Sequence, residues 1–472
     1  MFTPAQVKCI TRHYTVDEQF AGVTYTDPVA STICFEIVAL LEEKMDLLSI
    51  AIITAGLLLY SLVSGKLRGT FITAPLVFTL FGLAAGEGGF NIARISVGHS
   101  AIHVVAELTL VLVLFTDAAR IDFTSLRRDH NLPVRMLLIG LPLAIAGGTL
   151  FAVQLFPSFL FWEAALLAAL LAPTDAALGQ AVVSAQAVPV RIRQAINVES
   201  GLNDGIALPA VLLFAALASA EIATSGASDW IRFGVLQLTL GPVTGIAAGY
   251  LGARLLDGAA DRGLVSESFQ GIGILSLAVF TYVAAELIGG NGFIAAFIGG
   301  LVFGNTIRHP CKFLFEFMET EGQLLVLITF LVFGAALLPE AIRHAEPVFF
   351  IYAILSLTII RMIPIALSLL GTGLRAPSVL FLGWFGPRGL ASILFVLLIL
   401  EESQLPHREE LLSITVITVA LSILLHGITA APFARVYGSL AGRMGECEEN
   451  QPVVELPLRG GFAKTGTDTP AK

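Results

Sequence analysis

Long apolar runs alternate with short polar stretches from about residue 46 to residue 436. A bilayer core of about 30 Å needs about 20 apolar residues in a helix. Such runs predict thirteen membrane-spanning helices, at about 46–64, 71–88, 101–119, 134–156, 159–185, 193–220, 229–256, 268–288, 291–305, 320–338, 347–371, 377–400 and 409–436. The pattern therefore predicts an all-α polytopic membrane protein with about thirteen transmembrane helices.

The two ends of the chain do not follow this pattern. Residues 1–44 contain no run of membrane length and lack the features of a cleaved signal peptide, so we expect a disordered extension or a start codon placed too early. The membrane domain is predicted at 45–436. Residues 437–472 are polar and rich in glycine and proline, and we expect a disordered cytoplasmic tail there.

Composition agrees with a membrane protein. Hydrophobic residues make up 56% of the chain and charged residues 13%, with a mean hydropathy of +0.84, whereas soluble domains carry about 25% charged residues. The net charge is −9, and no basic region suited to nucleic acid is present. The spacing of the four cysteines suits neither a zinc site nor a disulfide framework.

Orientation follows from the basic residues, because cytoplasmic loops carry an excess of lysine and arginine. The loops after odd-numbered runs, counted together with the adjoining ends of the runs, carry thirteen: Lys66, Arg68, Arg120, Arg127, Arg128, Arg135, Arg191, Arg193, Arg254, Arg262, Arg308, Lys312 and Arg375. The loops after even-numbered runs carry four: Arg94, Arg232, Arg343 and Arg408. This asymmetry predicts that the N-terminus lies outside and the C-terminus in the cytoplasm.

The stretch NVESGLNDG, residues 197–205, lies inside the sixth apolar run. A carboxylate at membrane depth is costly unless it is paired, so it marks a candidate functional site. In a helix Glu199 and Asn203 share one face, and Ser200 and Asp204 share the neighbouring face. One face suits a structural ion pair, and the other can offer oxygen atoms to a cation.

The fifth run contains Pro173, which removes a backbone donor and predicts a helix break near Ala172–Thr174. Asp175 follows the break. Unwound backbone in a bilayer is tolerated only where protein or a water-filled cavity covers it. We predict that the Thr174 hydroxyl and the Asp175 carboxylate face an ion pathway. Asp175 as a cap on the following half-helix is the alternative, and both can hold.

The twelfth run contains a second predicted break, at the residues Gly383, Gly386, Pro387, Arg388 and Gly389. Interrupted helices at corresponding positions of two halves indicate a transporter binding site. The halves are predicted as inverted six-helix repeats. They cover about 45–220 and 268–436, linked by the helix at 229–256.

Arg361 lies inside the eleventh run, where an unpaired guanidinium would be costly. We predict that it pairs with Glu199, and Arg388 is the alternative partner. With Glu199 paired to Arg361, Arg388 is expected to neutralise helix-end carbonyls or to line the cavity.

The motifs ESGLNDG at 199–205, PTDA at 173–176 and GWFGPRG at 383–389 together resemble the NhaP-type branch of the monovalent cation:proton antiporters, cation:proton antiporter family 1. The same broad family includes the animal sodium/proton exchangers. The resemblance covers about residues 45–436. It implies a homodimer in which the interrupted helices of a core domain cross at mid-membrane and a separate domain forms the dimer contact.

The resemblance also implies a role for each motif residue. The implied ligands of Na+ are Asp204, Ser200, Asp175 and Thr174, with Asp204 also carrying the proton. The implied support consists of Glu199, Arg361 and Asn203, and the charge argument above adds Arg388. Two details depart from the family pattern: Ala176 and not proline follows Asp175, and Pro387 directly precedes Arg388.

The chemistry of these residues agrees with exchange of Na+ or Li+ for H+ across the cytoplasmic membrane. Partial desolvation brings the proton affinity of Asp204 into the range where a proton competes with a cation. Because residue 203 is Asn, one carboxylate titrates at this spot, which predicts electroneutral one-for-one exchange. We expect no cofactor and no enzymatic activity.

Two alternatives stay open. Oxygen ligands alone do not separate Na+ from K+, so K+/H+ antiport by the same fold is the main one. The distant alternative is an intramembrane aspartyl protease. Such enzymes typically carry a Gly-x-Gly-Asp arrangement, which this chain lacks at Asp204, since Leu202-Asn203 precedes it.

Overall fold

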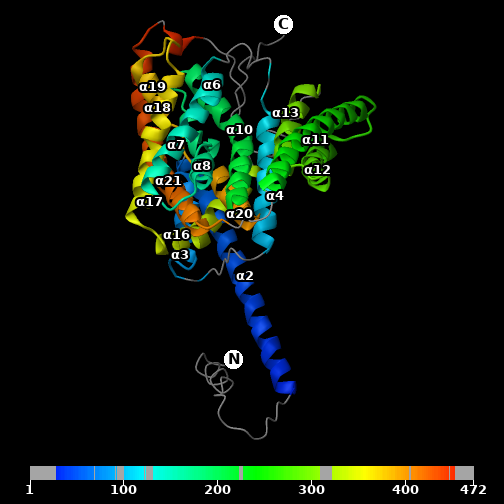
Figure 1. The fold of residues 1–472 in the computed structure, drawn as a ribbon. Coiled ribbons are helices and arrows are strands. Elements are labelled where there is room, and N and C mark those ends of the chain that lie inside the picture. The colour runs from blue at the N-terminus through cyan, green and yellow to red at the C-terminus, as the bar shows by residue number, and fades with distance from the viewer. Residues whose placement is uncertain are drawn as a thin grey trace. The chain divides into compact units, whose positions relative to one another are not determined.

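The computed structural model describes residues 28–67, 70–90, 92, 100–121, 123, 131–222, 227–308, 321–402, 405–445 and 447–451. Described residues form helices, turns and loops without a strand, which confirms the all-α class (Figure 1). The helices of the first half are α2 (Pro28–Leu67), α3 (Ala74–Ala85), α4 (Ser100–Ala119), α6 (Asn131–Arg135), η1 (Met136–Gly140), α7 (Leu141–Leu155), α8 (Phe161–Leu170), α9 (Ala176–Val183) and α10 (Val190–Ile222).

The remaining helices are α11 (Ala227–Asp261), α12 (Glu267–Leu287), α13 (Gly292–Thr306), α15 (Glu321–Val332), η2 (Phe333–Leu337), α16 (Leu338–Arg343), α17 (Pro347–Leu357), α18 (Ile359–Ser368), α19 (Ala376–Trp384), α20 (Leu390–Glu402), α21 (Arg408–Gly442) and η3 (Glu448–Asn450). Single turns of π-helix, η1 and η2, interrupt the fourth and tenth predicted runs, and the hydrophobic pattern does not predict them.

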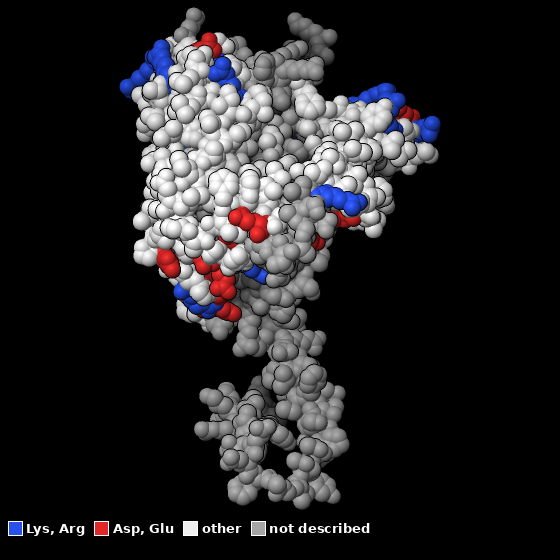
Figure 2. All heavy atoms as spheres, viewed as in Figure 1, with Lys and Arg blue, Asp and Glu red and all other residues white. Residues whose placement is uncertain are grey.

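Every predicted apolar run coincides with one or more of these helices. Among the described residues, eight helices are long and apolar enough to cross a bilayer, and α3, α8 and α13 are shorter apolar helices. The protein is therefore a multi-pass membrane protein, and the number of thirteen crossings stays a prediction. Uncharged residues dominate the described surface of the face drawn in Figure 2, as lipid contact requires.

The chain has two compact units, residues 1–51 and residues 52–472. The backbone is helical from Pro28, whereas the sequence pattern predicts that residues 1–44 are a disordered extension or follow a start codon placed too early. No glycine or proline follows Pro28 before the first apolar run, so nothing in the sequence breaks the helix. Residues 1–27 lie outside the described residues.

The tail is ordered further than the sequence predicts. α21 continues to Gly442, and η3 follows at Glu448–Asn450. Arg191 forms an ion pair with Glu448 at 2.6 Å. The backbone N–H of Arg375 and the hydroxyl of Ser378 donate to buried Glu449 at 2.7 and 2.8 Å. These contacts hold the segment to α10 and α19, and residues 452–472 lie outside the described residues.

Helices α11, α12 and α13 pack together beside α4 (Figure 1). Small residues allow close backbone approach in this group. A Cβ at Gly300 or Gly304 of α13 would collide with backbone atoms of Phe115 or Ala119 of α4. Glycine at such positions is typical of helix packing in membranes, where dispersion contacts stabilise association. The broken helices lie in the other part of the bundle.

Candidate functional site

Two interrupted helices meet at the centre of the site. α8 ends at Leu170 and α9 begins at Ala176, while α19 ends at Trp384 and α20 begins at Leu390. The sequence predicts both breaks, and proline and glycine are their physical cause. The backbone N–H of Asp175 donates to the carbonyl of Pro387 at 2.7 Å, so the two breaks touch directly.

Asp175 joins the first turns of two half-helices. Its Oδ1 accepts the backbone N–H of Leu178 in α9 at 3.3 Å, and its Oδ2 accepts the N–H of Leu390, the first residue of α20, at 2.7 Å. Its side chain is buried. The N-terminus of a helix carries unpaired N–H groups and a partial positive charge, which a carboxylate neutralises. Asp175 therefore caps the N-termini of two helices, α9 and α20.

Arg388 makes the reciprocal contact. Its Nη1 donates to the carbonyls of Ala172 and Pro173 at 2.7 and 3.1 Å, just beyond the end of α8. These carbonyls lack helical partners because Pro173 ends the helix. A buried cation at a helix C-terminus complements the negative end of the dipole. Each break thus supplies the charged group that satisfies the other.

Two glycines of the second break leave space for the buried charges. A Cβ at Gly386 would collide with the guanidinium of Arg361, and a Cβ at Gly389 would collide with the Asp175 carboxylate. Both charged side chains are buried, so they have little room to move aside. These glycines are needed for the site itself and not only for the break.

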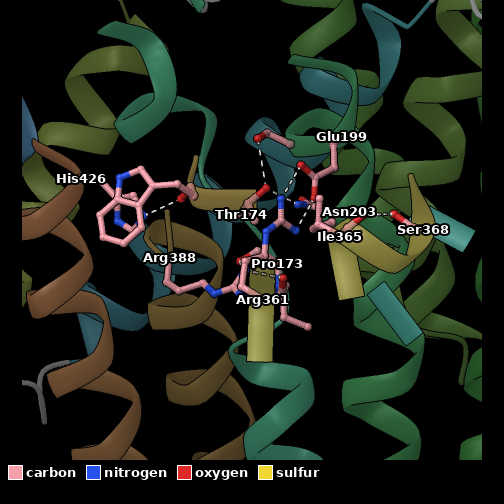
Figure 3. Close-up of polar contacts among 12 residues, drawn as sticks. Pro173, Thr174, Glu199, Asn203, Arg361, Ile365, Ser368, Arg388 and His426 are labelled. Carbon is pink, nitrogen blue, oxygen red and sulfur yellow. Dashed lines mark hydrogen bonds and ion pairs between the residues drawn. The ribbon is translucent and has the colours of Figure 1, made fainter. Parts of the chain in front are cut away.

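Glu199 and Arg361 form a two-pronged ion pair. Nη1 and Nη2 of Arg361 donate to the two carboxylate oxygens of Glu199 at 2.5 and 2.8 Å, as Figure 3 shows. Both side chains are 2% exposed. The sequence offers two partners for Glu199, Arg361 and Arg388. In the structure Glu199 pairs with Arg361, whereas Arg388 donates to the carbonyls just beyond the end of α8.

A chain of polar side chains connects the first break to α10. Thr174 Oγ1 and Ser200 Oγ are 3.1 Å apart, and the Asn203 amide nitrogen donates to Thr174 Oγ1 at 2.5 Å (Figure 3). All three residues are buried. Asn203 Oδ1 is also buried, and no described protein group donates to it. This cluster offers hydroxyl and amide oxygens beside the crossing, the ligand type that a hard cation takes.

Asp204 follows Asn203 on α10, one helical turn after Ser200. The residue is partly exposed although its Oδ1 is buried, whereas Leu202, Asn203 and Gly205 around it are buried. The other acids of the motif set, Asp175 and Glu199, are buried and engaged. Asp204 is therefore the one acid of this set that is not fully buried.

Two residues at the crossing are missing from the sequence-predicted set of site residues. Ser422 and His426 lie four residues apart on α21, and both contact the second break. Polar side chains four residues apart on one face of an apolar helix are the signal that marks them. The sequence gives no partner for them, because the contacts cross from one helix to another.

Two interrupted helices that meet with reciprocal charged caps are typical of the binding site of a secondary membrane transporter. The chain belongs to the sodium/hydrogen exchanger family, whose transmembrane region matches residues 50–436.

Several relatives support the same grouping. The K(+)/H(+) antiporter NhaP of Alkalimonas amylolytica is 25% identical over 83% of this chain and 67% of its own length. The K(+)/H(+) antiporter NhaP2 of Shewanella baltica is 25% identical over 82% of this chain and 66% of its own length. The chain thus spans about two thirds of the length of these relatives.

A solved structure has the same fold. The sodium proton antiporter MjNhaP1 from Methanocaldococcus jannaschii aligns with a TM-score of 0.68 at 19% identity, over 84% of this chain and 99% of that chain. At this identity the likeness concerns the arrangement of helices and not the ion.

Proposed function

We propose that the protein exchanges Na+ or Li+ for H+ across the cytoplasmic membrane, one for one, by competition of the cation and the proton for Asp204. One observation carries the proposal: Asp204 is partly exposed, while the neighbouring charged residues Glu199, Arg361 and Asp175 are buried. A group that must both load and release a proton needs a route to water, and Asp204 is the member of this set that is not fully buried.

The other oxygens of the proposed site come from Ser200, Thr174 and Asp175. Ser200 stands one turn before Asp204 and contacts Thr174 at 3.1 Å. Asp175 follows Thr174, and its two oxygens already accept backbone N–H groups, so its contribution to a cation is chiefly its charge. Asn203 orients the Thr174 hydroxyl by donating to it, which leaves lone pairs on the hydroxyl oxygens for a cation.

Competition at one carboxylate couples the two fluxes. A charged, empty Asp204 disfavours passage of the site across the low-dielectric barrier, whereas binding of either H+ or Na+ neutralises it. The site therefore changes access only when occupied, and each turnover exchanges one ion for the other. A substrate that binds one state better shifts the equilibrium toward that state.

Dequenching of a pH-sensitive dye in everted vesicles tests the assignment. Addition of Na+ or Li+ should dissipate the proton gradient with the wild-type protein and not with Asp204→Asn. Asp261→Asn, an exposed acid at the end of α11, is the matched control and should behave as wild type. Full activity of Asp204→Asn would exclude Asp204 as the ion-binding carboxylate.

K+ is the second candidate cation, because the relatives from Alkalimonas amylolytica and Shewanella baltica are K(+)/H(+) antiporters by name. The same vesicles decide between the ions. Dequenching by K+ at concentrations where Na+ and Li+ have no effect would assign the exchange to K+ and leave the role of Asp204 intact.

The proposal includes an arrangement in the membrane. The excess of basic residues in the odd-numbered loops supports an outside N-terminus and a cytoplasmic C-terminal tail. The group of α11, α12 and α13 beside α4 supports a separate domain that joins two copies into a homodimer. Inverted repeats over 45–220 and 268–436 agree with the two breaks in the fifth and twelfth runs.

A further inference from the structure

The crossing contains four half-helix termini, and three have charged partners. Asp175 serves the N-termini of α9 and α20, and Arg388 serves the carbonyls beyond the end of α8. The fourth is the C-terminus of α19, whose last residue is Trp384. Backbone carbonyls at a helix end need a donor when they are buried.

His426 supplies a donor to this fourth terminus. Its Nε2 lies 2.9 Å from the carbonyl oxygen of Trp384, which also accepts the N–H of Gly386. The Trp384 indole N–H donates to Thr429 Oγ1 at 3.0 Å, one turn further along α21. The end of α19 is thus attached to α21 through both its backbone and its side chain (Figure 3 shows His426 beside Arg388).

The same imidazole reaches the other edge of the break through Ser422. The backbone N–H of Arg388 donates to Ser422 Oγ at 2.7 Å, and Ser422 Oγ lies 3.1 Å from His426 Nδ1. The Ser422 carbonyl also lies 3.0 Å from Nδ1.

The protonation of the ring is assigned from this network. A carbonyl at Nε2 requires a proton there. Ser422 Oγ accepts from Arg388, so its own proton is available to Nδ1. The neutral Nε2–H tautomer satisfies every one of these contacts except the Ser422 carbonyl, which already belongs to helix α21.

We propose that His426 is a positioning residue of the ion site, which acts through Trp384 and Ser422 to fix both edges of the break in the twelfth run. Buried His426 is 1% exposed and lies on α21, outside the cation ligands. Fixing the Arg388 backbone sets where its guanidinium meets Ala172 and Pro173, next to Thr174. The inference rests on the proposed function, because it assumes that the crossing holds the cation.

Three variants test it in the vesicle assay, scored by the apparent affinity for the cation separately from the maximal rate. His426→Phe keeps an aromatic ring and removes both polar contacts. Its apparent affinity should fall about 10–100-fold, the usual effect of removing a group that orients ligands. His426→Gln keeps a donor and an acceptor and should recover most of the loss. Ser422→Ala removes the acceptor of the Arg388 N–H and should give an intermediate loss.

The control is His344→Gln, an exposed histidine beyond α16, which should match wild type. The proposal is wrong if His426→Phe lowers only the amount of folded protein at unchanged apparent affinity, or if His426→Gln is no better than His426→Phe. Should His426→Phe fail to fold, unchanged affinity in Ser422→Ala rejects the proposal. Asp204→Asn in the same vesicles keeps the two tests apart, because its activity reports on the ion-binding carboxylate alone.

Discussion

Glu199 holds Arg361 through both carboxylate oxygens in a pair that is 2% exposed on each side. The pair joins α10 to α18 at the depth of the site. Breaking a buried ion pair by neutralising one partner typically costs about 3–5 kcal/mol, because the other charge stays buried without compensation. We therefore expect the pair to fix α10 and α18 relative to each other and to take no part in binding the ion.

Glu199→Gln should lower the midpoint of thermal unfolding far more than it changes the apparent cation affinity. Tryptophan fluorescence of the detergent-solubilised protein measures the first, and the vesicle assay the second. Glu340→Gln is the control, since Glu340 pairs with Arg343 at an exposed site where ion pairs contribute at most about 1 kcal/mol. An unchanged midpoint for Glu199→Gln would contradict the structural role.

Gly389→Ala should abolish most transport, because the added Cβ would collide with the Asp175 carboxylate that caps α9 and α20. The loss should appear in activity and in thermal stability together. Gly147→Ala is the matched control: Gly147 lies in α7 with open space where a Cβ would be, and alanine favours a helix by about 1 kcal/mol. Wild-type transport by Gly389→Ala would show that the crossing tolerates displacement of Asp175.

Exchange should be electroneutral, because Asn203 leaves Asp204 as the titrating carboxylate at this point of α10. Purified protein in proteoliposomes, loaded with a potential-sensitive dye, should dissipate a pH gradient without building up a membrane potential. Clamping the potential with a K+ ionophore should leave the rate of Na+/H+ exchange unchanged. A potential that grows with exchange would mean that more charge moves per turnover than one carboxylate can carry.

Glu449→Gln should release the tail segment 447–451 from the N-terminus of α19. The wild-type carboxylate accepts the N–H of Arg375 and the hydroxyl of Ser378, and hydrogen bonds to a charged group are stronger than neutral ones. Hydrogen exchange followed by mass spectrometry should show faster exchange in 447–451. Glu409→Gln, at an exposed position near the start of α21, should leave this segment unchanged.

The same contact should depend on pH only under acid conditions. Burial raises the pKa of Glu449, but the Arg375 N–H, the Cys447 thiol and the Ser378 hydroxyl stabilise the charged form, so that the net pKa lies below its usual value. A lowered pKa contributes stability above the unfolded value of about 4.3 and loses it as pH falls through the folded value. Protection of 447–451 should therefore persist at pH 6 and be lost only at acid pH, below the unfolded value of about 4.3. Loss of protection near pH 6 would contradict a lowered pKa of Glu449.

Much of this site is predictable from single residues. Pro173 and the glycines around Arg388 predict both breaks, because proline removes a donor and glycine weakens a helix regardless of surroundings. The intramembrane charges of Glu199 and Arg361 predict that the two residues pair, because an unpaired charge is too costly at that depth.

Other features depend on contacts between distant segments. The second cap made by Asp175, on Leu390, needs two breaks to meet, and no local pattern encodes that meeting. The sequence does not distinguish His426 from other polar residues, because its contact with the Trp384 carbonyl joins two distant helices. Glu449 lies in a polar stretch that predicts disorder, and burial against α19 overrides this composition.

The reciprocal caps make the two halves of the chain mutually obligate. A fragment ending before α11 would carry Asp175 without Leu390, and Ala172 and Pro173 without Arg388. A fragment beginning at α12 would bury Arg361 and Arg388 with no carboxylate or carbonyl from the first half to meet them. Neither piece can satisfy its own backbone and charges in a bilayer. Two halves translated as separate chains would therefore have to associate in the membrane before either could reach its native structure.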